Sequence, residues 1–182
     1  GYMATGTIDG KPLEDDYIQN FAFNILAGGV DTTTSLTSNT LLHLSRNPAD
    51  RARLIAEPDL LPIAREEFVR YFTPIHGLAR NATGAVEMKG WKFDEGDRVY
   101  LAYSSANRDP AAFEDPEKLI IDRFPNKHIG FGAGMHRCVG SFLARLMFEV
   151  MIGEVLSRIP DYRVIEEEVV PYPMVGLVNG WI

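Results

Sequence analysis

The distribution of apolar positions along the chain predicts a mainly helical protein. Apolar residues recur at helical spacing between Glu14 and Asn47. They are Ile18, Phe21, Ile25, Leu26, Leu36, Leu41, Leu42 and Leu44. We therefore expect one long helix over Glu14–Asn47, beginning at the acidic pair Asp15 and Asp16. Pro48 should end it, because the residue before a proline avoids the helical conformation.

The middle of this helix is unusual. Residues Gly28 to Thr34 are a run of weak helix formers. Glycines weaken a helix, and threonine hydroxyls can bond to carbonyl groups one turn earlier and bend it. The sequence therefore predicts a local distortion. A close approach of another backbone and a notch beside a bound ligand are equally good explanations of it.

Further elements follow the long helix. Helices are expected over Pro48–Glu57, Leu60–Phe72 and Gly140–Ile159. The last should be buried, with one face formed by Phe142, Leu143, Leu146, Met147 and Val150. Strands are expected over Leu78–Thr83, Val86–Trp91 and Val99–Tyr103, an irregular segment over Asp109–Pro125, and short strands within Tyr162–Ile182.

Composition narrows the class of protein. The chain has 182 residues, enough for one domain with a buried core, and a net charge of −7 that argues against nucleic acid as a partner. No apolar run is long enough to cross a membrane, and the first ten residues do not resemble a signal peptide. A single cysteine excludes an internal disulfide and suits a reducing compartment, so we expect a cytoplasmic location.

That cysteine, Cys138, lies in a glycine-rich segment that precedes the last predicted helix. Glycines there permit a tight loop close to a flat ligand, and a helix N-terminus favours a thiolate over a thiol. A buried, inert thiol is the usual fate of a cysteine, but the surrounding glycines argue against it. A dinucleotide-binding loop would need glycine where Met135 or Arg137 stands. A zinc site would need more than one cysteine and four scattered histidines.

Four motifs, in order, carry a family resemblance. The loop reads Phe131-Gly-x-Gly-x-His136-x-Cys138-x-Gly140, and the other motifs are Gly28-Gly29-Val30-Asp31-Thr32, Glu67-x-x-Arg70, and the pair Ser105–Pro110 and Asp122–His128. Together they resemble the C-terminal half of a bacterial cytochrome P-450. The resemblance implies an α+β fold that is mainly α with small β-sheets. Its parts would be a long central helix, the E-x-x-R helix, an irregular meander, the cysteine-ligand loop and a following helix. Residues 1–182 would then form a partial haem-binding domain whose N-terminal half is absent.

The resemblance also assigns roles. Cys138 would be the proximal ligand of heme b, and His136 and Arg80 would meet its propionates. Phe131, Gly132 and Gly140 would shape the loop around the cofactor. Asp31 and Thr32 would lie over the distal face and deliver the protons that oxygen activation consumes.

Other roles follow from the same resemblance. Glu67 and Arg70 would form a structural ion-pair network, closed by Arg123 or by His128. The substrate pocket would include Ala27, Gly28, Ile75, His76 and Val175, from the segments Pro74–Leu78 and Met174–Leu177 and the distorted helix. Three basic residues, Lys127, Arg137 and Arg145, would either receive an acidic ferredoxin or form an ordinary solvated face.

The implied activity is that of a haem-dependent monooxygenase. It would take O2 and electrons from a ferredoxin-type donor and insert one oxygen atom into a small apolar substrate. Neither nucleic acid nor a membrane is expected as a partner. The alternatives are a non-catalytic haem-thiolate protein and an incomplete chain that binds no haem by itself. The isolated chain is expected to be inactive.

Overall fold

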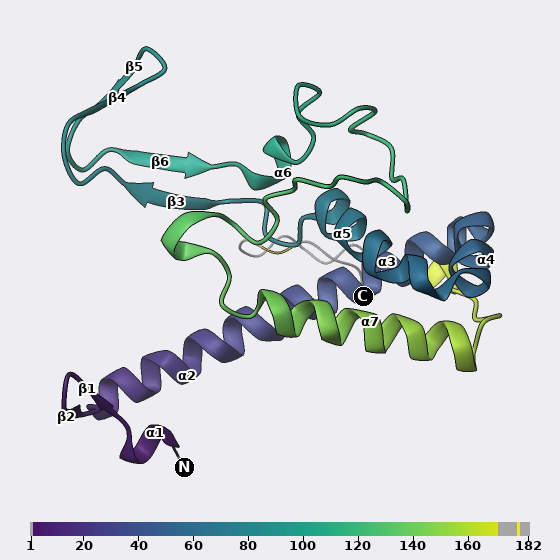
Figure 1. Cartoon of the computed structure of the whole chain (residues 1–182), viewed down its shortest axis with the longest axis horizontal. Coiled ribbons are helices and arrows are strands. Elements are labelled where there is room, and N and C mark those ends of the chain that lie inside the picture. Colours follow the sequence, from purple (N-terminus) through teal and green to yellow (C-terminus); the bar gives the residue numbers. More distant parts are fainter. Residues whose placement is uncertain (1, 171–177, 179–182) are drawn as a thin grey trace.

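The computed structural model describes residues 2–170 and 178. It begins with a short helix, α1 (Tyr2–Thr5), and a hairpin formed by β1 (Thr7–Ile8) and β2 (Lys11–Pro12). The sequence patterns did not predict this hairpin, whose turn consists of Asp9 and Gly10 in the left-handed region. Figure 1 places it at one end of the molecule, where the long helix begins.

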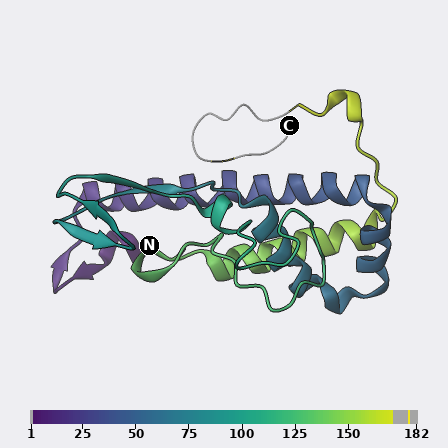
Figure 2. The same cartoon turned by 90° about the horizontal axis from the view of Figure 1, so that it is seen from above.

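The long helix has an interruption at one residue. It consists of α2 (Asp15–Gly29) and α3 (Asp31–Arg46), which meet at Val30. The hydrogen-bond ladder continues across the join, from Val30 N to Leu26 O and from Thr34 N to Val30 O. Figure 2 shows the two helices following one another along the long axis of the molecule. The predicted element and its distorted middle are therefore both present.

The buried core lies where three helices meet. These are α3, α5 (Leu61–Phe72) and α7 (Ser141–Arg158), with α4 (Pro48–Ala56) and the short 3-10 helix η1 (Pro58–Leu60) at one end. Their contact is dominated by Leu44, Phe68, Phe148 and Ile152, each at most 1% exposed. The Phe68 ring stacks on Phe72 and lies 5.8 Å, centroid to centroid, from Phe148. This core supports both the α5 side chains and the start of α7.

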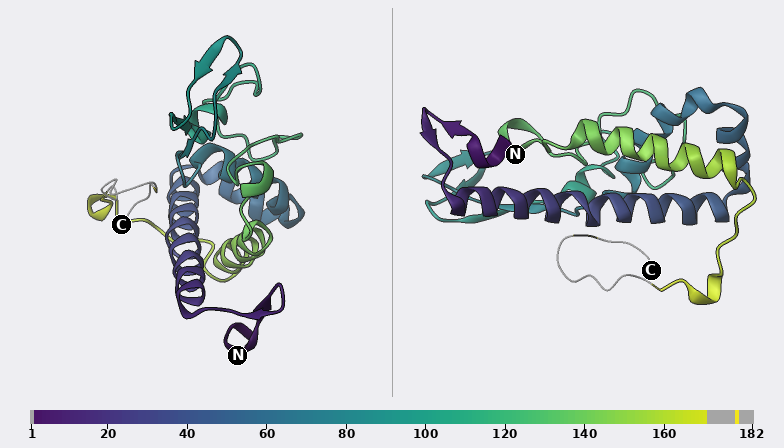
Figure 3. Two further views of the ribbon diagram at one scale, coloured as in Figure 1. Left: turned by 90° about the vertical axis from the view of Figure 1, so that its left-hand side faces the viewer. Right: turned by 90° about the horizontal axis from the view of Figure 1, so that it is seen from below.

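Two small antiparallel sheets follow α5. The first pairs β3 (Leu78–Asn81) with β6 (Arg98–Leu101), and the second pairs β4 (Val86–Met88) with β5 (Trp91–Phe93). The strand expected over Val86–Trp91 is thus wrong. Lys89 and Gly90 both have positive φ and turn the chain back as a two-residue hairpin loop. In Figure 3 these sheets extend away from the helices.

The remaining segments are mostly irregular. Tyr103, expected in a strand, instead begins the short helix α6 (Tyr103–Ala106). From residue 107 to residue 133 the chain is an irregular meander, which ends at the 3-10 helix η2 (Gly134–His136). Beyond α7 the described chain contains η3 (Glu166–Glu168) and an isolated bridge between Ile75 and Val178. Short strands were expected within Tyr162–Ile182, and this was wrong for residues 162–170, which contain η3 and no strand. Residues 171–177 and 179–182 lie outside the described residues.

Two helices keep apolar faces uncovered within this chain. None of the described residues of α2 is buried, and Phe23 and Leu26 are 69% and 65% exposed. On α7 the buried positions are Ser141, Phe148, Ile152 and Leu156, whereas the face that the sequence predicts to be buried is exposed. That face comprises Phe142, Leu143, Leu146, Met147 and Val150. The prediction was wrong because α7 is apolar around most of its circumference, so its pattern does not select the face that meets α3 and α5.

Within the described ranges, none of the helices combines the length and the apolar character needed to cross a bilayer.

Candidate functional site

The Cys138 loop is a closed turn that presents the sulfur to its surroundings. The backbone N–H of Cys138 donates to the carbonyl of Phe131 at 2.8 Å, which joins the two ends of the loop. Between them, Gly132 and Gly134 both have φ of 68°, a conformation that residues with a β-carbon rarely adopt. The thiol of Cys138 is free and exposed. The loop is therefore shaped by its glycines and leaves the sulfur accessible.

The loop is also held against the core. A β-carbon added to Gly130 would lie 2.7 Å from Cγ1 of Val69 on α5, so only glycine lets the chain pass this closely. Beyond the cysteine, the N–H of Ser141 donates to the Cys138 carbonyl at 3.3 Å, and Gly140 caps α7. Cys138 thus lies just before the start of α7, as the sequence predicts.

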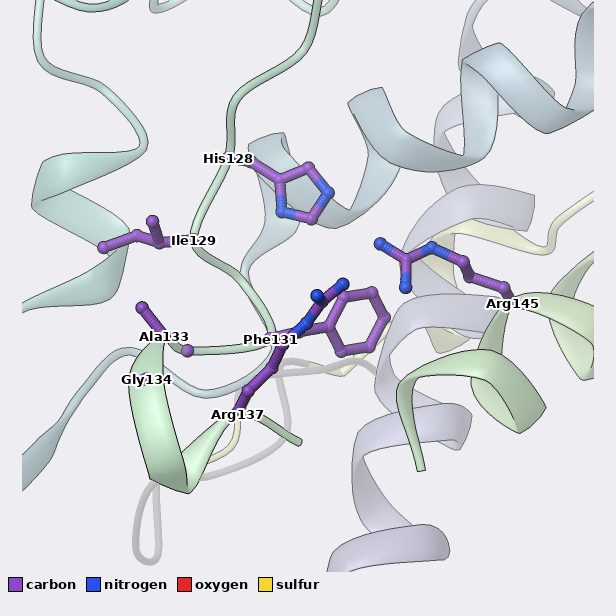
Figure 4. A pocket seen from close by; sticks show the side chains of 8 residues that line it. His128, Ile129, Phe131, Ala133, Gly134, Arg137 and Arg145 are labelled. Carbon is purple, nitrogen blue, oxygen red and sulfur yellow. The ribbon is translucent and has the colours of Figure 1, made fainter. Parts of the chain in front are cut away.

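Phe131 lies between two cationic or titratable side chains. Its ring centroid is 5.9 Å from that of His128, and the guanidinium of Arg145 lies 4.5 Å from it. Figure 4 shows both side chains beside the Phe131 ring, and in this view the Arg137 side chain overlaps the ring. These residues line a hollow of about 380 Å³, together with Ile129, Gly132, Ala133 and Gly134. The ring also packs against the edge of the main core.

The residues around Cys138 fit a flat apolar group that brings its own metal ligands. Met135 and Val139, on either side of the cysteine, are 98% and 90% exposed. Within residues 2–170 and 178, no group of three or more His, Cys, Asp or Glu side chains could hold a metal ion. A metal bound through Cys138 would then take its other ligands from outside the described residues, for example from a prosthetic group. Iron in a porphyrin meets that requirement, with cysteine thiolate as axial ligand.

The two predicted propionate partners differ in position. His136 ends η2 and is exposed, two residues before Cys138. Arg80 lies on β3, and its guanidinium donates to the carbonyl of Ala79 at 2.8 Å. Among the described residues, Arg80 forms no ion pair with a carboxylate. Both cationic or titratable groups are thus available for an anionic ligand.

Beneath the loop, α5 carries a buried ion pair. Glu67 and Arg70 are both 0% exposed, and their two hydrogen bonds measure 2.7 and 2.8 Å. The other N–H groups of Arg70 donate to the backbone carbonyls of Asn107, Pro116 and Lys118, each at 2.8 Å. Every guanidinium donor is therefore used. A buried charge is stable only when it is paired and hydrogen-bonded. Because three of the carbonyls that satisfy Arg70 belong to the irregular meander, the pair holds the meander against α5.

The carboxylate of Glu67 also binds two side chains from the later part of the meander. Nε of Arg123 lies 3.1 Å from both of its oxygens, and the amide of Asn126 donates to it at 3.0 Å. His128, the alternative partner, instead lies 2.9 Å from Glu66. The sequence left these two alternatives open, and the structure pairs Arg123 with Glu67.

Glu66 forms a second network on the other side of α5, which the sequence analysis missed. Arg145 donates to both of its oxygens at 2.8 Å, and His128 and Arg65 also contact it. Burial opposes ionisation of Glu66, but hydrogen bonds from Arg145 and His128 prevail and lower its pKa far below the ordinary value of 4.5. Glu66 therefore remains ionised. The adjacent pair Glu66-Glu67 could have indicated this second network. Neighbouring residues on a helix point in different directions, so two adjacent glutamates reach different partners.

The distorted helix places Asp31 and Thr32 at the start of α3. Asp31 is exposed in the first helical turn, and Thr32 is half-buried. The hydroxyl of Thr32 donates to the carbonyl of Gly28 at 2.7 Å, across the interruption at Val30. Its proton is thereby occupied, and its oxygen can accept a hydrogen bond from a neighbouring group. Ala27 and Gly28 are exposed on the preceding turn.

The other predicted pocket residues lie after α5. Ile75 and His76 are half-buried, and the carbonyl of His76 accepts the N–H of Ser104 at 3.0 Å. Gly77 follows them in a tight position, where a β-carbon would lie 2.3 Å from the carbonyl of Leu101. Val175 and the rest of Met174–Leu177 lie outside the described residues.

The predicted basic surface has two exposed members. Lys127 and Arg137 are exposed, as a docking surface requires. Arg145, by contrast, is turned inward, with a side chain 18% exposed and its charge neutralised by Glu66. The expectation that Arg145 joins Lys127 and Arg137 on one basic or solvated surface was therefore wrong.

Comparison with known proteins decides the family. The family model for "Cytochrome P450" matches residues 59–160. This range includes α5, the meander, the Cys138 loop and α7. The chain belongs to the cytochrome P-450 family. Its fold, mainly α with small sheets, is the C-terminal portion of the cytochrome P-450 fold.

Individual relatives agree. The chain is 38% identical over 157 residues to cytochrome P-450-terp of a Pseudomonas species, which covers 86% of this chain and 37% of the relative. It is 35% identical over 178 residues to a steroid C26-monooxygenase of Mycolicibacterium smegmatis, covering 98% and 44%. The crystal structure of CYP109E1 from Bacillus megaterium with testosterone matches at a TM-score of 0.88 and 38% identity, covering 97% of this chain and 49% of that one. The chain thus spans less than half the length of these relatives.

Proposed function

We propose that the whole protein is a haem-thiolate monooxygenase. It would insert one atom of O2 into an apolar organic substrate and release the other as water, consuming electrons from a donor and protons from solvent. The observation that carries this proposal is the position of Cys138. It is the only cysteine in these 182 residues, and it lies with its sulfur exposed in a glycine-shaped loop at the start of α7. Cytochromes P-450 hold haem iron through a cysteine thiolate.

Several residues would hold the cofactor, iron protoporphyrin IX (heme b). Cys138 would be its iron ligand, and His136 and Arg80 would donate charge-assisted hydrogen bonds to its propionates. Phe131, Gly132 and Gly140 would shape the loop on the sulfur side. The haem would supply O2 binding and its activation, to which an electron-rich thiolate contributes by favouring O–O cleavage.

Asp31 and Thr32 would manage protons on the opposite side. Because the Thr32 hydroxyl donates to Gly28, its oxygen would accept a hydrogen bond from a protonated group or water in the helix notch. Asp31 is exposed at the first turn of α3 and would connect that notch to solvent. The substrate would approach the same notch between Ala27 and Gly28 on one side and Ile75 and His76 on the other. Val175, which the family resemblance adds to this pocket, lies outside the described residues.

The electron donor would be a ferredoxin-type protein. Lys127 and Arg137 give the Cys138 side of an otherwise acidic chain two exposed positive charges, which suits an acidic partner. We also propose a cytoplasmic location, because a free, exposed cysteine persists in a reducing compartment. An apolar substrate is in keeping with the relatives named above, which include a steroid monooxygenase and a structure holding testosterone.

The test uses isotopically labelled O2. The whole protein with haem, a ferredoxin and its reductase is supplied with testosterone as the probe substrate, and label is measured in product and water. A monooxygenase places one labelled atom in the product and the other in water. A haem-containing protein that binds CO but transfers no label to any of a panel of apolar substrates would be a non-catalytic carrier, and the proposal would fall.

A further inference from the structure

The Glu66 network lies directly behind the Cys138 loop and has no part in the ion pair of Glu67. It consists of Glu66 on α5, His128 at the end of the meander and Arg145 on α7. Glu66 and Glu67 are consecutive residues of one helix, but Glu67 binds Arg70, Arg123 and Asn126. The two carboxylates therefore hold different parts of the molecule. What Glu66 holds is the pair of side chains that flank Phe131.

Phe131 is the residue through which this network reaches the loop. His128 lies 5.9 Å from the Phe131 ring and Arg145 lies 4.5 Å from it. Both are bound to the same carboxylate, His128 at 2.9 Å and Arg145 at 2.8 Å. Figure 4 shows His128 above the Phe131 ring and Arg145 to its right. The carbonyl of the same Phe131 accepts the N–H of Cys138 at 2.8 Å.

We propose that Glu66 is a positioning residue for the Cys138 loop. By binding His128 and Arg145 together it fixes the Phe131 ring, and the fixed residue then holds the backbone of Cys138 through its carbonyl. The effect passes through Phe131, since no hydrogen bond or ion pair joins Glu66 to Cys138 among the described residues. The inference rests on the proposed function only in treating Cys138 as the haem ligand.

Charge supports the same arrangement. Arg145 is a cation close to the sulfur, and Glu66 compensates it. The pKa of Arg145 is raised, first by its hydrogen bond to Glu66 and further by the nearby Cys138. A bidentate guanidinium–carboxylate pair is geometrically specific, so Arg145 is held over the Phe131 ring in one orientation. Such a clamp is the kind of support that keeps a ligand loop in its productive geometry.

The chain offers a matched control for the test. Arg65 bridges Glu66 and Glu149, so Glu149 belongs to the same cluster of charges. Glu149 contacts neither His128 nor Arg145 in the hydrogen bonds of the described chain. Glu149→Gln therefore removes a carboxylate nearby without disturbing the Phe131 clamp, whereas Glu66→Gln removes the clamp itself.

Backbone amide hydrogen exchange of the whole haem-containing protein measures the effect. Glu66→Gln should accelerate exchange across residues 126–140, including the Cys138 amide, by about tenfold or more, because opening of a local unit raises exchange there alone. Exchange in the core part of α7 should keep its wild-type rate, and Glu149→Gln should change neither region. Glu66→Asp, which keeps the charge, should restore part of the protection.

Three results would overturn the proposal. They are unchanged exchange over residues 126–140 in Glu66→Gln, an equal acceleration in the loop and the α7 core, and an equal effect of Glu149→Gln. If Glu66→Gln yields no folded protein, Arg145→Lys is measured instead, since lysine keeps the charge but loses the bidentate geometry. Loop exchange at the wild-type rate in that variant would equally overturn it. The readout does not require iron ligation by Cys138, so it is separate from the test of the function.

Discussion

The two sides of the candidate haem site differ in how completely this chain builds them. On the Cys138 side, α5, the meander and α7 enclose two carboxylates whose partners are all present, and Glu67 and Arg70 are 0% exposed. On the Thr32 side, α2 has no buried residue among those described, and its apolar side chains face outward. The hydrogen-bond networks of Glu66 and Glu67 on the ligand side are thus formed by residues of this chain alone. The oxygen side depends on apolar cover that these residues do not provide.

The strongest test of this difference between the two sides is to produce residues 1–182 alone. Exposed apolar faces on α2 and α7 favour association, and an uncovered haem edge admits water to the reaction. We expect aggregation or an oligomer, and no coupled oxygenation after addition of haemin. Size-exclusion chromatography, the absorption spectrum and product analysis measure this. A monomeric holoprotein that hydroxylates a substrate with good coupling would contradict it.

Glu67→Ala should have the next largest effect. It leaves Arg70 and Arg123 without their carboxylate, and removal of one partner from a buried pair costs about 3–5 kcal/mol. The expected product is insoluble or haem-free protein. The matched control is Glu117→Ala, which removes the exposed partner of Arg108 and should cost about 0–1 kcal/mol. Normal haem content with slow turnover in Glu67→Ala would assign the pair to catalysis instead of structure.

Thr32→Ala should leave folding intact and impair the proton transfer that oxygen activation requires. Loss of a group that assists proton transfer commonly lowers the assisted step by about 10²–10⁴-fold. Electrons should then appear in hydrogen peroxide instead of product, with substrate binding nearly unchanged. Thr34→Ala is the control, because the Thr34 hydroxyl makes the same kind of helix bond, to Val30 at 3.0 Å. Coupling at the wild-type level in Thr32→Ala would exclude the proposed proton role.

The contrast between the two sides also explains what could be predicted from sequence. The long helix and its distortion follow from local properties, namely helical spacing and the Gly28–Thr34 run. The Cys138 loop follows from glycines that must adopt positive φ. The exposed face of α7 could not be predicted, since the pattern of a helix that is apolar all round does not indicate which face is buried. The hairpin at Lys89-Gly90 was missed because its strands are short and follow one another closely.

The Glu66 network escaped prediction for a different reason. Its partners are 62 and 79 residues away, on the meander and on α7. The identity of Glu66 as a clamp depends on the chain path that brings His128 and Arg145 to one face of α5. In the sequence, only the adjacent pair of glutamates indicates a second carboxylate beside the one that binds Arg70.

The smallest expected effect is the pH dependence of that clamp. Hydrogen bonds from Arg145 and His128 overcome burial and depress the pKa of Glu66, so its contribution is present above 4.5 and is lost as the pH falls below it. At neutral pH, Glu66→Gln should destabilise the protein by about 1 kcal/mol after solvent screening. The difference between variant and wild type should shrink in acid. Denaturant unfolding at neutral pH and below 4.5 measures it, and a difference that grows in acid would contradict this sign.

The identity of the iron ligand is the central claim, and the spectrum of Cys138→Ser tests it most directly. In the whole protein, the reduced CO complex should show the red-shifted Soret band of thiolate ligation, because Cys138 is the only residue of these 182 that can supply a thiolate. Replacement of Sγ by a hydroxyl oxygen should abolish that band even if haem remains bound. A Cys138→Ser protein that keeps the red-shifted band would show that the thiolate is supplied from elsewhere, and the account of this loop would be wrong.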